Sequence, residues 1–277
     1  MPKKIISVIS GKGGVGKSSL AVNLSILLAK SGVSTLLIDA DIFNPCVFFH
    51  LGISPQSVGM GELLEGKSSL EEVFSIHPGS GLRVISSSIQ TYGKIKSERL
   101  GKIIDSLNYE YIIIDCPPGF SPLIREAVAL SSHIYVVLTP DMPSCSAALK
   151  LVTFIRNYVS GKAAFTYFLN RMSNVPYAIH PREVESLFRA RLGSIIPEDP
   201  NVPKSIASKT PLVLMDPNSK FSKALRAAVP SLLHNRDHRF DMVEQPPSRI
   251  QPIAGENGGG LPGLLRNLLQ RLQSEVV

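Results

Sequence analysis

The hydrophobic residues of the chain follow two alternating patterns. Short runs rich in Ile, Val and Leu contain few polar residues, which is typical of strands buried on both faces of a parallel sheet. The segments between these runs carry apolar residues three or four positions apart, the spacing of helices with one buried face. The expected strands are 5–9, 35–39, 82–85, 111–115, 134–138, 164–169 and 193–196. The expected helices are 19–30, 98–107, 122–131, 144–158, 182–191 and 219–233.

Strands that alternate with helices predict an α/β fold, in which a doubly wound, mostly parallel sheet carries helices on both faces and the crossovers are right-handed. Of the 277 residues, 44% are hydrophobic, which is enough to bury a sizeable core. We expect this domain to span residues 1–236.

The pattern changes beyond the last expected helix. Residues 237–260 contain three prolines and four glycines and show little periodicity, so we interpret them as a flexible linker that spans roughly 25–30 Å. In residues 261–277, six leucines fall on one arc of a helix, and polar residues that include Arg266 and Arg271 cover the rest. This amphipathic helix could dock on the folded domain, pair with another helix or bind a membrane surface. The long linker favours the membrane.

Composition narrows the cellular setting but does not identify a partner. The formal net charge of +7 is compatible with anionic partners of several kinds, including nucleotides, lipid headgroups and nucleic acid. Cys46, Cys116 and Cys145 are widely spaced and form no Cys-x-x-Cys pair, so neither a zinc site nor a redox pair is indicated. We expect a reduced, cytosolic location without a signal peptide or membrane-spanning helix.

The most specific motif is a glycine-rich phosphate loop between the first expected strand and helix. It matches the pattern Gly-x-x-x-x-Gly-Lys-Ser, in which backbone amides surround phosphate oxygens at a helix N-terminus. We expect Lys17 to contact the β- and γ-phosphates of ATP and Ser18 to ligate Mg²⁺. The expected nucleotide-binding residues of the loop are Gly11, Lys12, Gly13, Gly14, Val15, Gly16, Lys17, Ser18 and Ser19.

Three carboxylates follow apolar strands and are candidates for the metal site. Asp39 and Asp41 come at the end of one expected strand, and Asp115 ends another. Ligands bind at the carboxyl ends of strands in open α/β sheets, and carboxylates beside a triphosphate need a cation between them. We therefore expect Asp39 and Asp115, with Ser18, to hold Mg²⁺. Asp41 could serve the reaction or only cap a loop.

An ordinary phosphate loop has no need of a second lysine, yet Lys12 precedes Lys17 in the stretch 12–18. This stretch resembles the signature of the ParA/MinD family, which are dimerising P-loop ATPases with a deviant Walker A motif. The resemblance implies that Lys12 reaches across a homodimer to the nucleotide of the partner and stabilises the transferring phosphoryl group. The alternative for Lys12 is an ordinary solvated charge.

Further segments extend this resemblance. Residues 39–45 resemble the first switch of the family, which implies that Asp39 lies in the outer shell of Mg²⁺ and that Asp41 orients the attacking water. Residues 117–119 resemble the second switch. By the same resemblance Asn170 contacts adenine, although it could be only a turn residue. The loop Pro197, Glu198 and Asp199 would surround the base through backbone contacts. The role of Asp141 stays open.

Taken with the amphipathic tail, the resemblance implies a MinD-like ATPase that dimerises with ATP, binds the inner face of the cell membrane through residues 261–277 and hydrolyses ATP. Its catalytic residues would be Lys12, Lys17 and Asp41. It would control spatial positioning, such as division-site placement, with an unidentified regulatory or recruited partner. The alternatives are a ParA-type DNA segregation ATPase, a relative that positions flagella, pili or chemoreceptor arrays, and an iron–sulfur cluster carrier. The amphipathic tail argues against nucleic acid.

Overall fold

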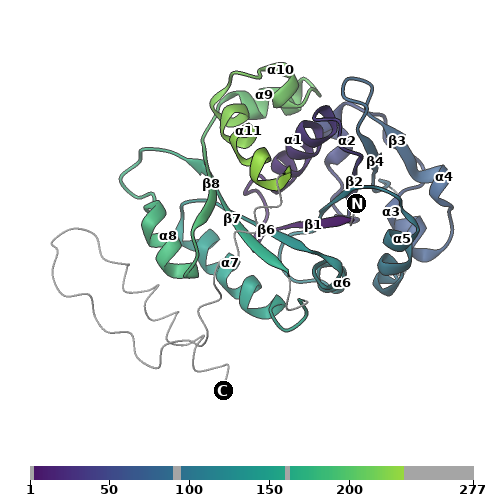
Figure 1. The fold of residues 1–277 in the computed structure, drawn as a ribbon, viewed down its shortest axis with the longest axis horizontal. Coiled ribbons are helices and arrows are strands. Elements are labelled where there is room, and N and C mark those ends of the chain that lie inside the picture. The colour runs from purple at the N-terminus through teal and green to yellow at the C-terminus, as the bar shows by residue number, and fades with distance from the viewer. Residues whose placement is uncertain (1–2, 90–94, 160–162, 234–277) are drawn as a thin grey trace.

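A computed structural model describes residues 3–89, 95–159 and 163–233 of the chain. Its eight strands form one sheet in the order β3-β4-β2-β5-β1-β6-β7-β8 (Figure 1). The strands are β1 (Lys4–Ile9), β2 (Thr35–Asp39), β3 (Phe74–Ile76), β4 (Arg83–Ile85), β5 (Tyr111–Asp115), β6 (His133–Leu138), β7 (Ala164–Met172) and β8 (Leu192–Pro197). The predicted linker 237–260, the predicted helix 261–277 and the end of the predicted domain lie outside the described residues.

All adjacent strand pairs of the sheet are parallel except β3–β4 at one edge, so the predicted fold class is confirmed. Strand β1 lies between β5 and β6, which places the loop that follows β1 at the middle of the carboxyl edge of the sheet. The strands expected from the sequence are all present, with ends that differ by up to three residues. The additional edge strand β3 has three residues, too few for a recognisable alternation.

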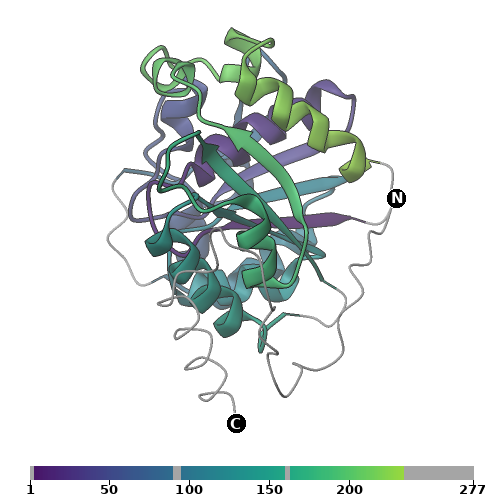
Figure 2. The same ribbon diagram turned by 90° about the vertical axis from the view of Figure 1, so that its left-hand side faces the viewer.

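Helices cover both faces of the sheet (Figure 2). One face carries α1 (Lys17–Lys30), α2 (Val47–Leu51), α9 (Asn201–Ala207), α10 (Leu212–Met215) and α11 (Lys220–Leu233). The other face carries α3 (Met60–Glu65), α4 (Leu70–Val73), α5 (Leu100–Ser106), α6 (Pro122–Leu130), α7 (Met142–Ile155) and α8 (Pro181–Phe188). In the described ranges, no helix combines the length and the apolar character needed to cross a membrane.

The six expected helices are observed, although the first residues of the segment 98–107 form a 3₁₀ turn, η1 (Ser97–Arg99), before α5. The sequence analysis did not predict α2, α3, α4, α9 and α10. These helices have four to seven residues, so they contain too few turns to display a helical period. Their apolar residues pack into the two cores that the long elements build, and this packing accounts for their formation.

The central strands fill two separate cores by alternation. In β5, Ile112 and Ile114 pack on the side of α5, α6 and α7, while Ile113 packs on the side of α1 and α11. All three side chains are fully buried. Burial on both faces explains why the strand reads as an unbroken apolar run rather than as an alternation of apolar and polar residues.

Replacing Ile113 with alanine should lower the free energy of unfolding by about 2–5 kcal/mol, because the truncation leaves a cavity in a close-packed core. The matched control is Ile76→Ala in the edge strand β3, where the side chain is 53% exposed and the loss should stay below about 1 kcal/mol. Urea unfolding of both variants measures the difference. Equal losses would contradict the assignment of β5 to the centre of the sheet.

Candidate active site

The loop Gly11–Ser18 connects β1 to α1 and owes its shape to its glycines. Gly14 and Gly16 have φ angles of +79° and +88°, in the left-handed region that favours glycine. Gly11 is required for a different reason, since a Cβ atom there would lie 2.2 Å from the backbone carbonyl carbon of Ala147 in α7. The first turn of α1 contains no acidic residue, so its free amides and its dipole favour an anion.

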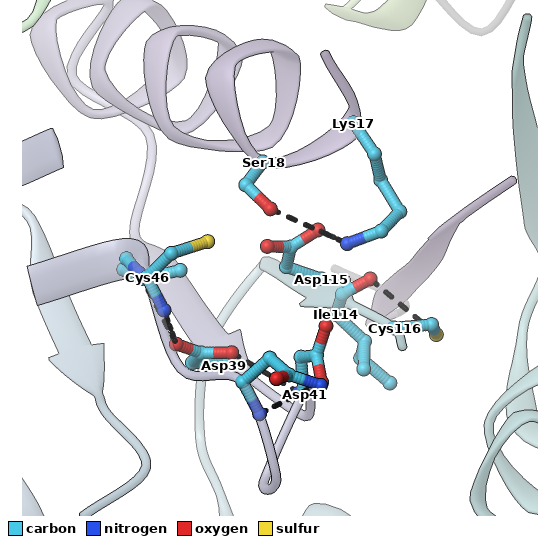
Figure 3. A network of polar contacts seen from close by, with 10 residues as sticks. Lys17, Ser18, Asp39, Asp41, Cys46, Ile114, Asp115 and Cys116 are labelled. Atoms are coloured by element: carbon cyan, nitrogen blue, oxygen red, sulfur yellow. Dashed lines mark hydrogen bonds and ion pairs between the residues drawn. The ribbon is translucent and has the colours of Figure 1, made fainter. Parts of the chain in front are cut away.

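Lys17 and Asp115 form a buried ion pair behind this loop (Figure 3). Lys17 Nζ lies 2.6 Å from Asp115 Oδ1, and the two side chains are 7% and 0% exposed. Burial by itself lowers the pKa of Lys17, but the adjacent Asp115 carboxylate offsets this and raises the pKa above its ordinary value. The second oxygen, Asp115 Oδ2, is buried and has no hydrogen-bond partner among the described residues.

Asp39 lies beside Asp115, because β2 and β5 are adjacent parallel strands that pair these two residues in register. Its Oδ1 accepts from the backbone amide of Asp41 at 3.1 Å, and its Oδ2 accepts from the amides of Cys46 and Val47 at 3.2 Å each. Burial, assisted by the charge of Asp115, raises the pKa of Asp39 to about 8. Two buried carboxyl groups therefore lie side by side, and Lys17 is a cation whose charge acts on Asp39.

Asp41 completes the group of carboxylates. Its Oδ1 accepts from the backbone amide of Asn44 at 3.3 Å, so it does cap the loop that leads to α2. Its side chain also lies close enough to Lys17 for the ammonium charge to lower its pKa, although burial dominates and raises it. The loop contact and a role in the reaction are compatible, since one carboxylate oxygen can accept several hydrogen bonds.

Cys46 is a site residue that the sequence analysis did not identify. Its amide binds Asp39, and its thiol lies near Ser18 and Asp115. Burial and the charge of Asp115 raise the pKa of this thiol to about 12, so it stays protonated. No local sequence pattern predicts this contact, because it depends on where the start of α2 lies relative to the ends of β2 and β5.

The arrangement suits a magnesium ion. An orphaned carboxylate oxygen on Asp115, a second carboxylate on Asp39 and the hydroxyl of Ser18 provide hard oxygen donors beside an anion-binding loop. Within the described ranges, no cluster of three or more His, Cys, Asp or Glu side chains is arranged as a metal cage. Mg²⁺ does not require one, because it is usually held by one or two carboxylates together with phosphates and water.

The second lysine of the loop has a different environment from the first. Lys12 Nζ lies 3.2 Å from Asp141 Oδ1, and both side chains are 42% exposed. Asp141 is the N-cap of α7 and also accepts from the backbone amide of Ser144 and the hydroxyl of Thr139. Partial burial would raise the pKa of Asp141, but these hydrogen bonds and the charge of Lys12 hold it below its ordinary value. The role of Asp141, which the sequence analysis left open, is therefore to cap α7 and to contact Lys12.

The predicted base-binding residues lie at the ends of β7 and β8. The side-chain nitrogen Nδ2 of Asn170, a residue inside β7 rather than after it, donates to the carbonyl of Val15 at 2.7 Å and so supports the phosphate loop. The Glu198 amide donates to the Met172 carbonyl. The Asp199 carboxylate accepts from the amides of residues 201 and 221, at the starts of α9 and α11. Contact of Asn170 and of residues 197–199 with adenine stays a prediction.

A glycine-rich loop at the end of the central strand, a buried lysine at the start of α1 and acidic residues at the ends of β2 and β5 define a P-loop nucleoside triphosphatase fold. The ParA family model, described as NUBPL iron-transfer P-loop NTPase, matches residues 1–233. The chain belongs to the ParA family of P-loop NTPases.

Characterised and uncharacterised relatives agree with this assignment. An uncharacterized ATP-binding protein of Methanocaldococcus jannaschii is 30% identical over 82% of this chain and 87% of its own length. The septum site-determining protein MinD of Thermotoga maritima is 31% identical over 79% of this chain and 84% of its own length. The structure of MinD from Pyrococcus horikoshii superposes with a TM-score of 0.76 at 24% identity, covering 84% of this chain and 97% of that one.

Substituting Gly11 with alanine should lower the free energy of unfolding by about 1–3 kcal/mol, because the new methyl group must displace the backbone of α7. Gly13→Ala is the matched control in the same loop, since the nearest atom to its added Cβ is 3.9 Å away. That variant should stay within about 0.5 kcal/mol of the parent chain. Urea unfolding without nucleotide compares them, and similar losses would contradict the described packing of the loop on α7.

Asp141→Asn should lower the free energy of unfolding by less than about 1 kcal/mol, because an exposed ion pair is weak and asparagine still caps a helix. Asp141→Ala removes the cap as well and should cost about 1 kcal/mol more. Thermal or urea unfolding of the two variants separates the effects. If both variants lost the same amount, the hydrogen bond to the amide of Ser144 would not be a stabilising cap.

Proposed function

We propose that this protein is a MinD-like ATPase, which dimerises with ATP, hydrolyses it and binds the membrane through residues 261–277. The observation that carries the nucleotide part is the convergence of Lys17, Asp39 and Asp115 behind the phosphate loop. The membrane part rests on the leucine arc that the sequence predicts for residues 261–277 and on the long linker before it. The location that follows is peripheral, on the cytoplasmic face of the cell membrane.

Different residues of the loop would bind different parts of the nucleotide. The amides of Gly13 to Ser18 would bind phosphate oxygens, and Lys17 would exchange part of its contact with Asp115 for the β- and γ-phosphates. Ser18, Asp39 and Asp115 would hold Mg²⁺, directly or through water. Once bound, Mg²⁺ supplies positive charge that offsets the phosphates and the buried carboxylates. The structure of Pyrococcus horikoshii MinD is a complex with Mg-ADP, which supports this choice of ligands.

Asp41 and Lys12 would serve the reaction itself. Asp41 lies at the carboxyl end of β2 within the field of Lys17, where its carboxylate would orient the water that attacks the γ-phosphate. Lys12 is unsuited to the phosphates of its own chain while it contacts Asp141, but that contact is weak. An exposed ion pair contributes about 0–1 kcal/mol, so a second subunit with a bound triphosphate could readily attract this lysine.

The relatives suggest what such a dimer does. MinD of Thermotoga maritima is described as a septum site-determining protein, and a MinC:MinD complex of Aquifex aeolicus is among the similar structures, at 25% identity and a TM-score of 0.71. We infer a role in spatial positioning, with division-site placement as the first case and a protein partner recruited or regulating the dimer. A dimer presents two tails, and bivalency can raise membrane avidity by about 10²-fold or more.

Two other functions are the alternatives to this proposal. A plasmid partition protein of Borrelia burgdorferi, bound to AMPPNP, shares the fold at 21% identity with a TM-score of 0.71, and at this identity the likeness concerns the fold alone. The matching family model is described by iron transfer. Against a cluster between subunits, Cys116 and Cys145 are buried and only Cys46 is partly accessible. DNA binding at physiological salt, and iron content after anaerobic purification, distinguish these functions from the proposed one.

Sedimentation with vesicles of one part phosphatidylglycerol and three parts phosphatidylcholine tests the proposal. We expect the full chain to bind at least tenfold more tightly with ATP than with ADP, because only ATP brings two tails together. A chain that ends at His234 should not sediment with either nucleotide. Lys17→Ala should remove the response to ATP by removing nucleotide binding.

Lys12→Ala is the sharper variant, because Lys12 does not contribute to the buried ion pair. It should still bind ATP but lose dimer-dependent hydrolysis, measured as phosphate release at increasing protein concentration. Equal vesicle binding by the ATP form, the ADP form and the shortened chain would refute the membrane proposal. Phosphate release that is unchanged in Lys12→Ala would refute the role assigned to this lysine.

A further inference from the structure

The helices on one face of the sheet contain no acidic residue within their described bounds. These are α1, α2, α9, α10 and α11, and four of them, α1, α9, α10 and α11, lie together at the top of Figure 1. The helices of the other face, α3 to α8, contain eight Asp and Glu residues and four Lys and Arg residues. Charge is therefore divided unequally between the two faces, a feature that the net charge of the chain does not reveal.

Six exposed cations form a basic face on the first group of helices and the turns beside them. They are Lys30, Lys204, Lys209, Lys220, Lys223 and Arg226. The three cations of α11 are spaced three residues apart, so they fall within an arc of roughly 120° on the exposed side of that helix. The nucleotide mechanism uses none of the six.

The charges of this basic face are not neutralised by neighbouring carboxylates. Asp216 is the only acidic residue between positions 200 and 233. Among the described residues, none of the six cations forms an ion pair, and Lys204 and Arg226 each donate to a neutral oxygen. A concentration of unpaired charge of one sign produces a field that attracts an anionic partner.

Apolar surface opens between these cations. A pocket of about 640 Å³ lies beside Lys30 and Arg226, and its lining includes the buried Val213 and the half-buried Leu27 and Leu214. The interface of an acidic membrane offers both anionic headgroups and apolar surface, so it can satisfy the two kinds of group at once. The phosphate backbone of a nucleic acid would match only the charges.

The same region lacks the side chains on which unpaired bases stack. In residues 200–233, which the structure describes throughout, the only aromatic residue is Phe221, and it is buried. Met215, at the end of α10, is by contrast 38% exposed. Proteins that bind single-stranded nucleic acid combine a basic groove with exposed aromatic rings. An exposed aliphatic side chain among cations favours lipid over nucleic acid.

We propose that the basic face lies against acidic lipid headgroups when the protein is on a membrane, so that the ATPase body contacts lipid as well as residues 261–277. This inference rests on the proposed membrane function and adds a second contact to it. The chain leaves the body at the end of α11, the helix that carries three of the six cations. The predicted linker spans roughly 25–30 Å, which allows the tail and the face to reach the same surface.

The face would strengthen the hold of the tail and would not replace it. A lysine or arginine close to an acidic membrane surface raises the affinity about fivefold, and the attraction decays within about 10 Å at physiological ionic strength. On vesicles with a minority of acidic lipid, such a contact is too weak to retain a chain without its tail. With the tail attached, it would orient the body with α11 toward the lipid.

Reversing the charge of α11 tests this contact in the full chain. With ATP and the mixed vesicles of phosphatidylglycerol and phosphatidylcholine used above, the triple variant Lys220→Glu, Lys223→Glu and Arg226→Glu should bind at least about tenfold more weakly than the parent chain. With vesicles of phosphatidylcholine alone, the two chains should bind equally. A triple variant with glutamine at these positions should show a smaller loss in the same direction.

The matched control reverses three exposed cations on the opposite face, namely Lys102→Glu in α5, Arg125→Glu in α6 and Lys150→Glu in α7. It changes the net charge of the chain by the same amount. Its affinity for the mixed vesicles should stay within about twofold of the parent, because its substitutions face away from the lipid. Equal losses in the two triple variants would overturn the proposal, since net charge alone would then explain them.

Tryptophan fluorescence tests the orientation, because the chain contains no tryptophan. Met215→Trp places the probe on the basic face, and Phe154→Trp in α7 is a control at a position of nearly equal exposure, 39%. On vesicles that contain brominated phosphatidylcholine, quenching of the first variant should be at least about threefold stronger than that of the second. Equal quenching of the two probes would contradict the assigned orientation.

A further arm separates this inference from the proposed function. Leu265→Asp and Leu268→Asp together disable the leucine arc of the full chain. On vesicles of phosphatidylglycerol alone at low ionic strength, this chain should still bind, and the α11 charge reversal should weaken that binding at least about tenfold. If the parent chain fails to bind the mixed vesicles, the membrane function is refuted, while this arm still decides whether the face binds acidic lipid.

The remaining outcomes are equally decisive. If the parent chain binds the mixed vesicles and the α11 charge reversal binds them as tightly, the membrane function stands and the basic face is refuted. Duplex DNA at physiological salt provides the last comparison. If the parent chain binds DNA and the α11 charge reversal abolishes this binding but leaves vesicle binding unchanged, the face is a nucleic-acid surface and the proposal is overturned.

Discussion

The burial of two acidic side chains, Asp39 and Asp115, at the carboxyl ends of β2 and β5 is the constraint on which the site depends. Register places Asp39 directly beside Asp115, and both carboxylates are fully buried. Bringing two such groups out of water is costly unless hydrogen bonds and cations offset the loss. The chain supplies three backbone amides to Asp39 and the ammonium of Lys17 to Asp115. The unpartnered oxygen of Asp115 leaves this compensation incomplete, which suits a site that receives a cation together with its nucleotide.

The two lysines of the phosphate loop differ in burial and in their ion-pair partners. Gly11 allows the loop to lie against the backbone of α7, and Asn170 supports it from β7 through the carbonyl of Val15. This packing directs Lys17 into the sheet edge, where it is buried, and leaves Lys12 half-exposed beside the cap of α7. A buried lysine with a carboxylate partner is held in the site of its own chain. A lysine held only by an exposed ion pair can leave it at little cost, as the proposed contact with a second subunit would require.

Helix α1 connects the nucleotide site to a pocket that residues of α10 and α11 also line. Its first residue is Lys17, and its last turn contributes Leu27 and Lys30 to the lining of that pocket. Its 14 residues span about 21 Å as a straight helix, so the two sites are separate but share one rigid element.

The sequence by itself determined the strands, the long helices and the identity of the loop, because these features have strong local periodicity or a fixed spacing of residue types. It also indicated which carboxylates end the strands. Only the tertiary structure decided that Asp115 pairs with Lys17, that Asp141 holds Lys12, and that Asn170 lies behind the loop, since each contact joins residues far apart in the chain. Short helices such as α2 could likewise not be predicted from the sequence. The same holds for the position of Cys46 beside Asp39. Such short helices carry too little local signal, and their conformation is set by packing on elements that form elsewhere in the chain.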